Sequence, residues 1–214
     1  MKGLLKNNLF AVFSNVKVFS VFMLIFGIFV IAVISPSLLI GYVLFGTVGF
    51  SVIAMTGIKK EFVSKWGKYK LTLPIKRTSI VKSYFISQIL WLLVGMLFSG
   101  AGIGLSWLLH GCPFDTGIDT LSVFAAGISI SLFTGAIFFP LFYLCGEEKG
   151  EVTLVISLLC GVGITLGIVS LLNLYLTPGL SAVLLGAAVL IVCSLLMFIL
   201  SYQVTICIYR KKEY

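Results

Sequence analysis

The sequence predicts an all-α polytopic membrane protein with six transmembrane helices and both termini in the cytoplasm. Apolar residues make up 60% of the 214 residues and charged residues 10%, and the mean hydropathy is +1.19. A soluble domain carries about 25% charged residues, so this chain has too few to cover a water-facing surface. Long apolar stretches and a one-sided distribution of Lys and Arg complete the prediction. We interpret residues 1–214 as a single transmembrane domain.

Six apolar stretches meet the length that a membrane-spanning helix requires, which is about 20 predominantly apolar residues. Breaks containing Pro36, Pro113 and Pro178 follow the first, third and fifth stretches. Counted from Ser79, the third helix would be about 45 Å long against a hydrocarbon core of about 30 Å. We expect its first turns to stand in the cytoplasm, because Lys82 would otherwise lie in lipid. The predicted spans are about 18–34, 38–57, 83–109, 120–144, 152–172 and 180–208.

The basic residues determine the predicted orientation. Three lie before the first span, eight between the second and third, one between the fourth and fifth, and three in the C-terminal tail, which accounts for all 15 Lys and Arg. The other three loops contain none. Because Lys and Arg are retained on the cytoplasmic side, both termini and the charged loops are predicted to be cytoplasmic.

The N-terminal segment has the pattern of an interfacial helix on the inner leaflet. Three lysines are spread through the first 20 residues, so no cleavable signal peptide is expected. A helical wheel separates an apolar face from a polar face. The apolar face holds Leu5, Leu9, Val12 and Phe13, and the polar face holds Asn7, Asn8, Ser14 and Asn15.

The sequence lacks the residues that several classes of membrane protein require for their function. No Asp, Glu, Lys or Arg lies deep in a predicted span, which argues against proton-coupled transport. There is no G-x-x-x-x-G-K-[ST] motif, so an ATP-driven role requires a partner ATPase. We expect no catalytic residue, metal site or cofactor on this chain, and His110 is interpreted as an interfacial residue. The five cysteines form no disulfide or metal pattern and are expected to be packing residues.

The loop after the second span, within residues 59–82, combines eight basic residues with aromatic ones. On a helix, Phe62, Trp66 and Tyr69 fall on one face, and Pro74 ends the helix. Three interpretations remain open. The loop is a cytoplasmic loop whose aromatics rest at the lipid boundary, a segment that recruits anionic lipid, or a helix that docks on a cytoplasmic partner.

Two motifs resemble a known family. The run Trp66–Arg77 followed by Ile80–Ser83 is similar to the "W-x-x-Y-x-x-T-L-P-basic" loop of ABC-2 type permeases, the membrane subunits of ABC exporters. Pro140–Tyr143 with Gly146–Gly150 is a second similarity. The resemblance covers the chain and is to short bacterial members related to exporters of amphipathic or antimicrobial peptides.

The resemblance implies a coupling helix that docks on a cytoplasmic ABC ATPase, which would bind ATP and Mg²⁺. It also implies a secondary cytoplasmic contact after the fourth span. The implied coupling residues are Lys60, Glu61, Phe62, Trp66, Tyr69, Lys70, Leu73 and Pro74, and the secondary contact is Gly146, Glu147, Glu148 and Lys149.

The same resemblance implies that one chain forms half of a pathway, so that a homodimer or a pair with a related permease is expected. Substrate would pass between the protomers along walls from the second and fifth spans, with Phe45 and Phe50 as candidate wall residues. Glycine clusters at 100–104 and 161–167 allow close helix packing.

The predicted function is therefore the permease subunit of an exporter in a bacterial plasma membrane, acting on an amphipathic or hydrophobic substrate such as a peptide. It would be a transport subunit and not an enzyme. The main alternative is the vitamin-binding membrane subunit of an energy-coupling importer, although the loops expected outside have few polar residues for capture. A membrane chaperone or assembly factor is a third alternative.

Overall fold

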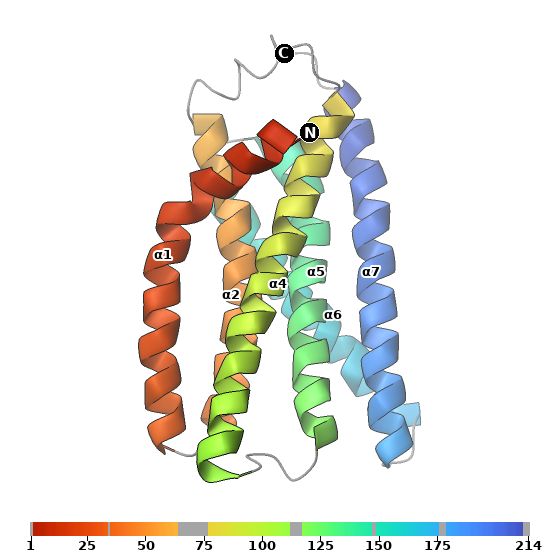
Figure 1. The fold of residues 1–214 in the computed structure, drawn as a ribbon. Coiled ribbons are helices and arrows are strands. Elements are labelled where there is room, and N and C mark those ends of the chain that lie inside the picture. Colours follow the sequence, from red (N-terminus) through yellow and green to blue (C-terminus); the bar gives the residue numbers. More distant parts are fainter. Residues whose placement is uncertain are drawn as a thin grey trace.

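The computed structural model describes residues 2–33, 35–63, 77–111, 117–146, 149–175 and 179–211, and these residues form a bundle of long α-helices (Figure 1). Each helix is long and apolar enough to cross a membrane. The described residues contain no β-strand. The helices are α1 (Lys2–Val33), α2 (Pro36–Val63), α4 (Arg77–His110), α5 (Gly117–Cys145), α6 (Gly150–Tyr175) and α7 (Leu180–Lys211).

The prediction of an all-α bundle with six apolar helices is confirmed, and each predicted span falls in a different helix. Several helices extend beyond their predicted spans. Helix α4 has 34 residues and begins at Arg77, two residues before the predicted start. Helices α1 and α7 each have 32 residues. At 1.5 Å per residue these three helices exceed the thickness of the hydrocarbon core.

Both ends of the described chain lie at the same end of the bundle, which we call the terminal end (Figure 1). The end of α2 and the start of α4 also lie there, whereas the α1–α2 connection lies at the opposite, distal end. The helix ends that carry described basic residues, at the start of α1, the end of α2, the start of α4 and the end of α7, therefore lie at one end of the bundle. The positive-inside rule predicts that this end is cytoplasmic.

The N-terminal segment is continuous with the first span and does not form a separate interfacial helix. Its first turns are inclined to the rest of α1 (Figure 1). The predicted faces are wrong in part, since Asn8 is 5% exposed whereas Phe13 is 46% exposed. Asn8 can be buried because its Nδ2 donates a hydrogen bond to Ser83 Oγ of α4, 2.9 Å away.

The helices pack in two groups. Helix α2 contacts α1, α4 and α5, and helix α5 contacts α6 and α7. The α2–α5 and α4–α7 contacts join the two groups. One hydrophobic cluster fills the terminal half between α4, α5 and α7, and a second runs between α1, α2 and α4. At Gly95 a Cβ would lie 2.6 Å from the Gly46 carbonyl oxygen, so α2 and α4 touch there through their backbones.

The glycine clusters contribute unequally to this packing. Gly102 lies against the ring of Tyr42, and Gly161 lies against Thr134. An added Cβ would meet nothing within 4 Å at the remaining glycines of the two clusters, which are Gly100, Gly104, Gly163 and Gly167.

The exposure of the cysteines differs from the prediction that they are packing residues. Cys145, Cys160 and Cys207 are exposed on the helices and Cys193 is half-buried. The prediction is wrong at the three exposed positions, because their side chains point away from the helix contacts. Cys112 lies outside the described residues.

Candidate functional site

The predicted coupling segment connects the terminal ends of α2 and α4. Helix α2 continues without a break to Val63, so Lys60, Glu61 and Phe62 belong to its last turns rather than to a separate short helix. The structure describes the backbone of these three residues and not their side chains. The other predicted coupling residues lie outside the described residues; they are Trp66, Tyr69, Lys70, Leu73 and Pro74.

The predicted secondary contact lies where α5 ends and α6 begins. Gly146 has φ 84°, and its N–H donates to the Phe142 carbonyl at 3.1 Å, which is a left-handed helix C-cap that favours glycine. Lys149 is exposed, and its carbonyl accepts a hydrogen bond from Thr153 Oγ1 at 2.9 Å. Glu147 and Glu148 lie outside the described residues.

The first turns of α1 bind the helices on both sides of the coupling segment. Ser83 of α4 accepts the hydrogen bond from Asn8 and donates its own to the Ile80 carbonyl at 2.7 Å. Val12, which is 1% exposed, lies directly against Gly57 of α2. These contacts hold α1, α2 and α4 together next to the segment that joins α2 to α4.

A buried polar junction connects α2, α4 and α5 inside the bundle. Gln88 Nε2 donates to Ser51 Oγ at 3.3 Å and to the Ser131 carbonyl at 3.0 Å. Ser131 Oγ donates to Ser51 Oγ at 2.6 Å. All three residues are at most 1% exposed. Such hydrogen bonds between apolar helices fix their relative positions, because no water replaces a lost partner.

Gly135 makes room for the amide of this junction. A Cβ at Gly135 would overlap the Gln88 amide, so only glycine fits against it. Gln88 Oε1 has no hydrogen-bond partner in the part of the chain that the structure describes. The amide is therefore held by the hydrogen bonds of its nitrogen, and Gly135 packs against both its nitrogen and its oxygen.

A second polar contact connects α5 to α7. Pro140 lies inside α5 and has no N–H, so it leaves the Ala136 carbonyl without its helical partner. Ser201 Oγ of α7 donates to that carbonyl at 2.6 Å. Neighbouring serines commonly satisfy backbone groups that proline frees in membrane helices.

The functional residues predicted from the sequence do not include Ser51, Gln88, Ser131 or Ser201. The available signal was Gln88, a large polar side chain inside an apolar span, where an unpartnered amide is costly. The serines gave no such signal, because serine is common in membrane helices and often bonds its own backbone.

The arrangement can position helices, and it offers no cluster of ionisable groups. Among the described residues, no three His, Cys, Asp or Glu side chains lie together as a metal site requires. The hydroxyl and amide groups of the junction do not titrate near neutral pH. The junction therefore serves to position α2, α4 and α5 through hydrogen bonds.

A family model described as ABC-2 family transporter protein matches residues 3–210 of the chain. The chain belongs to the ABC-2 family of transporters. This confirms the resemblance predicted from the loop motif and shows a multi-pass ABC transporter permease, a transport subunit that is not itself catalytic. No curated protein and no solved structure matches the chain.

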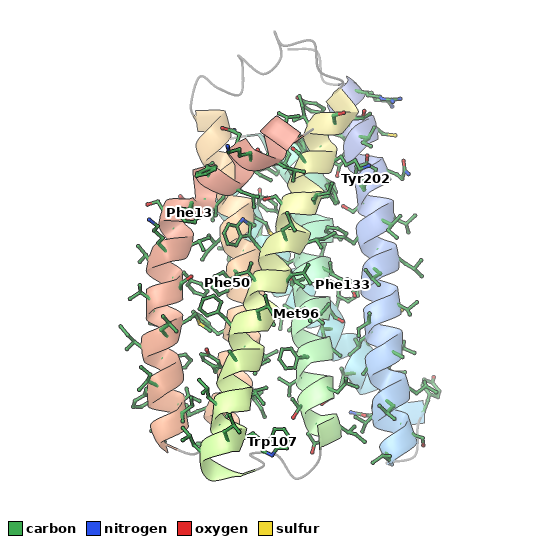
Figure 2. The ribbon with its side chains drawn as sticks, in the orientation of Figure 1. Phe13, Phe50, Met96, Trp107, Phe133 and Tyr202 are labelled. Carbon is green, nitrogen blue, oxygen red and sulfur yellow. The ribbon has the colours of Figure 1, made fainter. Side chains whose placement is uncertain are left out.

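The position of Phe50 in this ABC-2 permease differs from the prediction that it lines a pathway wall. Phe50 is fully buried, with its ring 4.9 Å from Phe19 and 5.1 Å from Phe98, and Figure 2 shows it inside the bundle. The prediction of Phe50 as a pathway wall is wrong, because α1 and α4 cover it. Phe45 is 48% exposed and packs on one side against rings of α1, including Phe22 at 5.9 Å.

Proposed function

We propose that this ABC-2 permease is the membrane-spanning half of an exporter, powered by a separate cytoplasmic ATPase. The family match over residues 3–210 carries the proposal. The sequence has no P-loop motif of its own, so the energy comes from a partner chain that binds ATP and Mg²⁺. The membrane is a bacterial plasma membrane, with the terminal end of the bundle in the cytoplasm.

The ATPase docks on the segment between α2 and α4. Phe62, Trp66 and Tyr69 anchor it, because aromatic side chains bury a large area and lose few rotamers on binding. The turn at Glu147, Glu148 and Lys149 makes a second contact. The continuity of α2 into this segment supports the assignment, since a force on Phe62 acts directly on a membrane-spanning helix.

Movement at the terminal end passes into the bundle through hydrogen-bonded helix pairs. The Asn8–Ser83 contact connects α1 to α4, and the Gln88 junction connects α2 and α4 to α5. The Ser201 contact connects α5 to α7. Helices tied in this way move as packed units, which a partner that closes on ATP can displace.

The substrate is amphipathic or hydrophobic, and an amphipathic peptide fits this class. It passes between this chain and a second permease protomer, either an identical copy or a related chain. The described helices present many exposed apolar side chains and no deeply placed charge, which suits a substrate with an apolar face. Gly163 and Gly167 of α6 have open space beside them, which suits close approach of another helix.

The first test is the adjacent reading frame, where we expect a P-loop ATPase of the ABC class. Co-expression of that ATPase with the permease should give a complex that survives purification in detergent. The double variant Phe62→Ala with Trp66→Ala should lower the affinity at least about tenfold, since two aromatic anchors are lost. The permease itself should elute and unfold as the unchanged protein does.

The matched control is Phe29→Ala with Trp107→Ala. These aromatics are 56% and 62% exposed, and Trp107 lies at the distal end of α4 (Figure 2). The control should retain the ATPase. Normal co-purification and normal export by the Phe62–Trp66 variant would contradict the coupling assignment.

A further inference from the structure

A cavity of about 580 Å³ lies in the distal half of the bundle, between α2, α5, α6 and α7. Small side chains enlarge it, because Ala126 of α5 and Ala182, Gly186 and Ala187 of α7 face it. At Gly186 an added Cβ would meet one atom within 4 Å, Leu172 Cδ1 at 3.8 Å. Helix α6 makes few contacts with α2 and α7, so the space lies where these helices are apart, and the small residues enlarge it.

The lining changes from polar to apolar with depth. Ser122 and Asn173 lie at the mouth, near the distal ends of α5 and α6. The floor is formed by Leu44 and Leu190, and Leu190 lies about 15 Å along α7 from its first residue. Among the described residues that line the cavity, none is ionisable. This gradient matches a molecule with a polar head at the membrane surface and a hydrocarbon tail in the membrane.

The size and chemistry of the cavity favour a tail over water. Ordered water needs two to four polar partners, which the floor does not offer. The volume falls within the range of about 300–1,000 Å³ that is usual for small-molecule sites. The helices that form the cavity also face the lipid, since Leu171 is 59% exposed and Leu185 is 50% exposed. The surrounding solvent at this depth is therefore hydrocarbon.

We propose that this cavity binds one acyl chain of a phospholipid from the leaflet at the distal end. The head group lies at the mouth, where the Asn173 amide can donate to an ester or phosphate oxygen. The chain extends to Leu190 along the small residues of α7. All the residues that line this site belong to one protomer, and two of its four helices, α2 and α6, are the second and fifth spans expected as pathway walls. The site depends on the membrane placement of the chain and not on the ATPase.

The test uses the purified full chain in nanodiscs that contain phosphatidylglycerol and a phospholipid with a diazirine at the end of one acyl chain. After irradiation and digestion, mass spectrometry should find the label at the floor of the cavity, in the segments that contain Leu44 and Leu190. Gly186→Leu places a larger side chain in the cavity and should lower this labelling at least about fivefold. Labelling of the lipid-facing surface around Val21 of α1, which is 57% exposed, should not change.

Gly104→Leu is the matched control, because Gly104 lies in the distal half on α4 and has open space beside it outside this cavity. Its labelling should equal that of the unchanged protein. Ala182→Leu is a second filling variant for the case in which Gly186→Leu fails to fold. The proposal is overturned if the cavity segments carry no label above the α1 reference, or if both filling variants leave their labelling unchanged.

Discussion

The two halves of the α5–α6–α7 group are both built largely from apolar sequence and yet pack differently. In the terminal half, aromatic rings fill the space between α4, α5 and α7, with Phe85 and Phe139 centred 4.2 Å apart and Phe85 and Phe198 4.9 Å apart. In the distal half, Ala126, Ala182, Gly186 and Ala187 are among the residues that line a cavity of about 580 Å³. A second distal cavity of about 310 Å³ lies between α1, α2 and α4.

Hydropathy and packing are therefore separate properties of a membrane helix. Lipid is as apolar as leucine, so burial from water does not pull these helices together once they are in the membrane. The contacts that hold them are dispersion between well-fitted side chains and hydrogen bonds between helices. The size of the inward residues and the separation of the helices together determine how well a level of the bundle is filled.

The largest expected effect is in the filled half. Phe139→Ala removes a ring that is 1% exposed and that contacts the rings of Phe85, Phe138 and Phe198. It should destabilise the protein by about 3–5 kcal/mol, because the surrounding rings cannot close the void. Equilibrium unfolding in mixed micelles measures the change. Phe29→Ala, at a position 56% exposed, should cost within about 0.5 kcal/mol; equal costs would contradict the distinction between filled and exposed positions.

An identical substitution in each half makes the comparison sharper. Gly135→Ala places a methyl group on the Gln88 amide and should destabilise by about 1–3 kcal/mol, because the amide can move only by breaking its hydrogen bonds. Gly186→Ala points a methyl group into the distal cavity and should be neutral or stabilising by up to about 1 kcal/mol, as alanine favours helix. The unfolding midpoints of the two variants measure this difference. If both substitutions changed the free energy of unfolding in the same direction, the two halves would not differ in their tolerance of an added methyl group.

The smallest expected effect concerns the hydrogen bond across the terminal half. Ser201→Ala leaves the Ala136 carbonyl without a donor and should cost about 0.5–2 kcal/mol. Ser194→Ala is the control, because that hydroxyl bonds the Ile191 carbonyl of its own helix. In a Pro140→Ala background the cost of Ser201→Ala should shrink, since an alanine in place of the proline restores the helical N–H donor. An equal cost of Ser201→Ala in the presence and in the absence of Pro140 would contradict the proposal that Pro140 frees the carbonyl that Ser201 binds.

Much of the fold could be predicted because lipid imposes strong rules on a sequence. The six spans followed from hydropathy, since every backbone group in hydrocarbon must be bonded within a helix. The grouping of basic segments at one end followed from their alternation along the chain. The length of α2 was underestimated, because the helix continues to Val63, beyond the apolar stretch that was predicted to end at residue 57.

The contacts of single side chains could not be predicted in the same way. Asn8 was assigned to a polar face, and its burial depends on Ser83, 75 residues away along the chain. Phe50 was expected on a pathway wall, and only the positions of α1 and α4 show that it is covered. Periodicity reveals which face of a helix is apolar, but in a membrane both lipid-facing and buried faces are apolar.

The sequence by itself determined that this chain lies in a membrane, crosses it six times and gathers its basic segments on one side. It did so because hydrocarbon excludes charge and unpaired backbone wherever they occur. The tertiary structure alone determined which serines and which glutamine form hydrogen bonds between helices. It also determined that Ser201 of α7 donates to the carbonyl freed by Pro140, and that a cavity lies in the distal half. These features depend on distances between helices, which residue type and spacing do not specify.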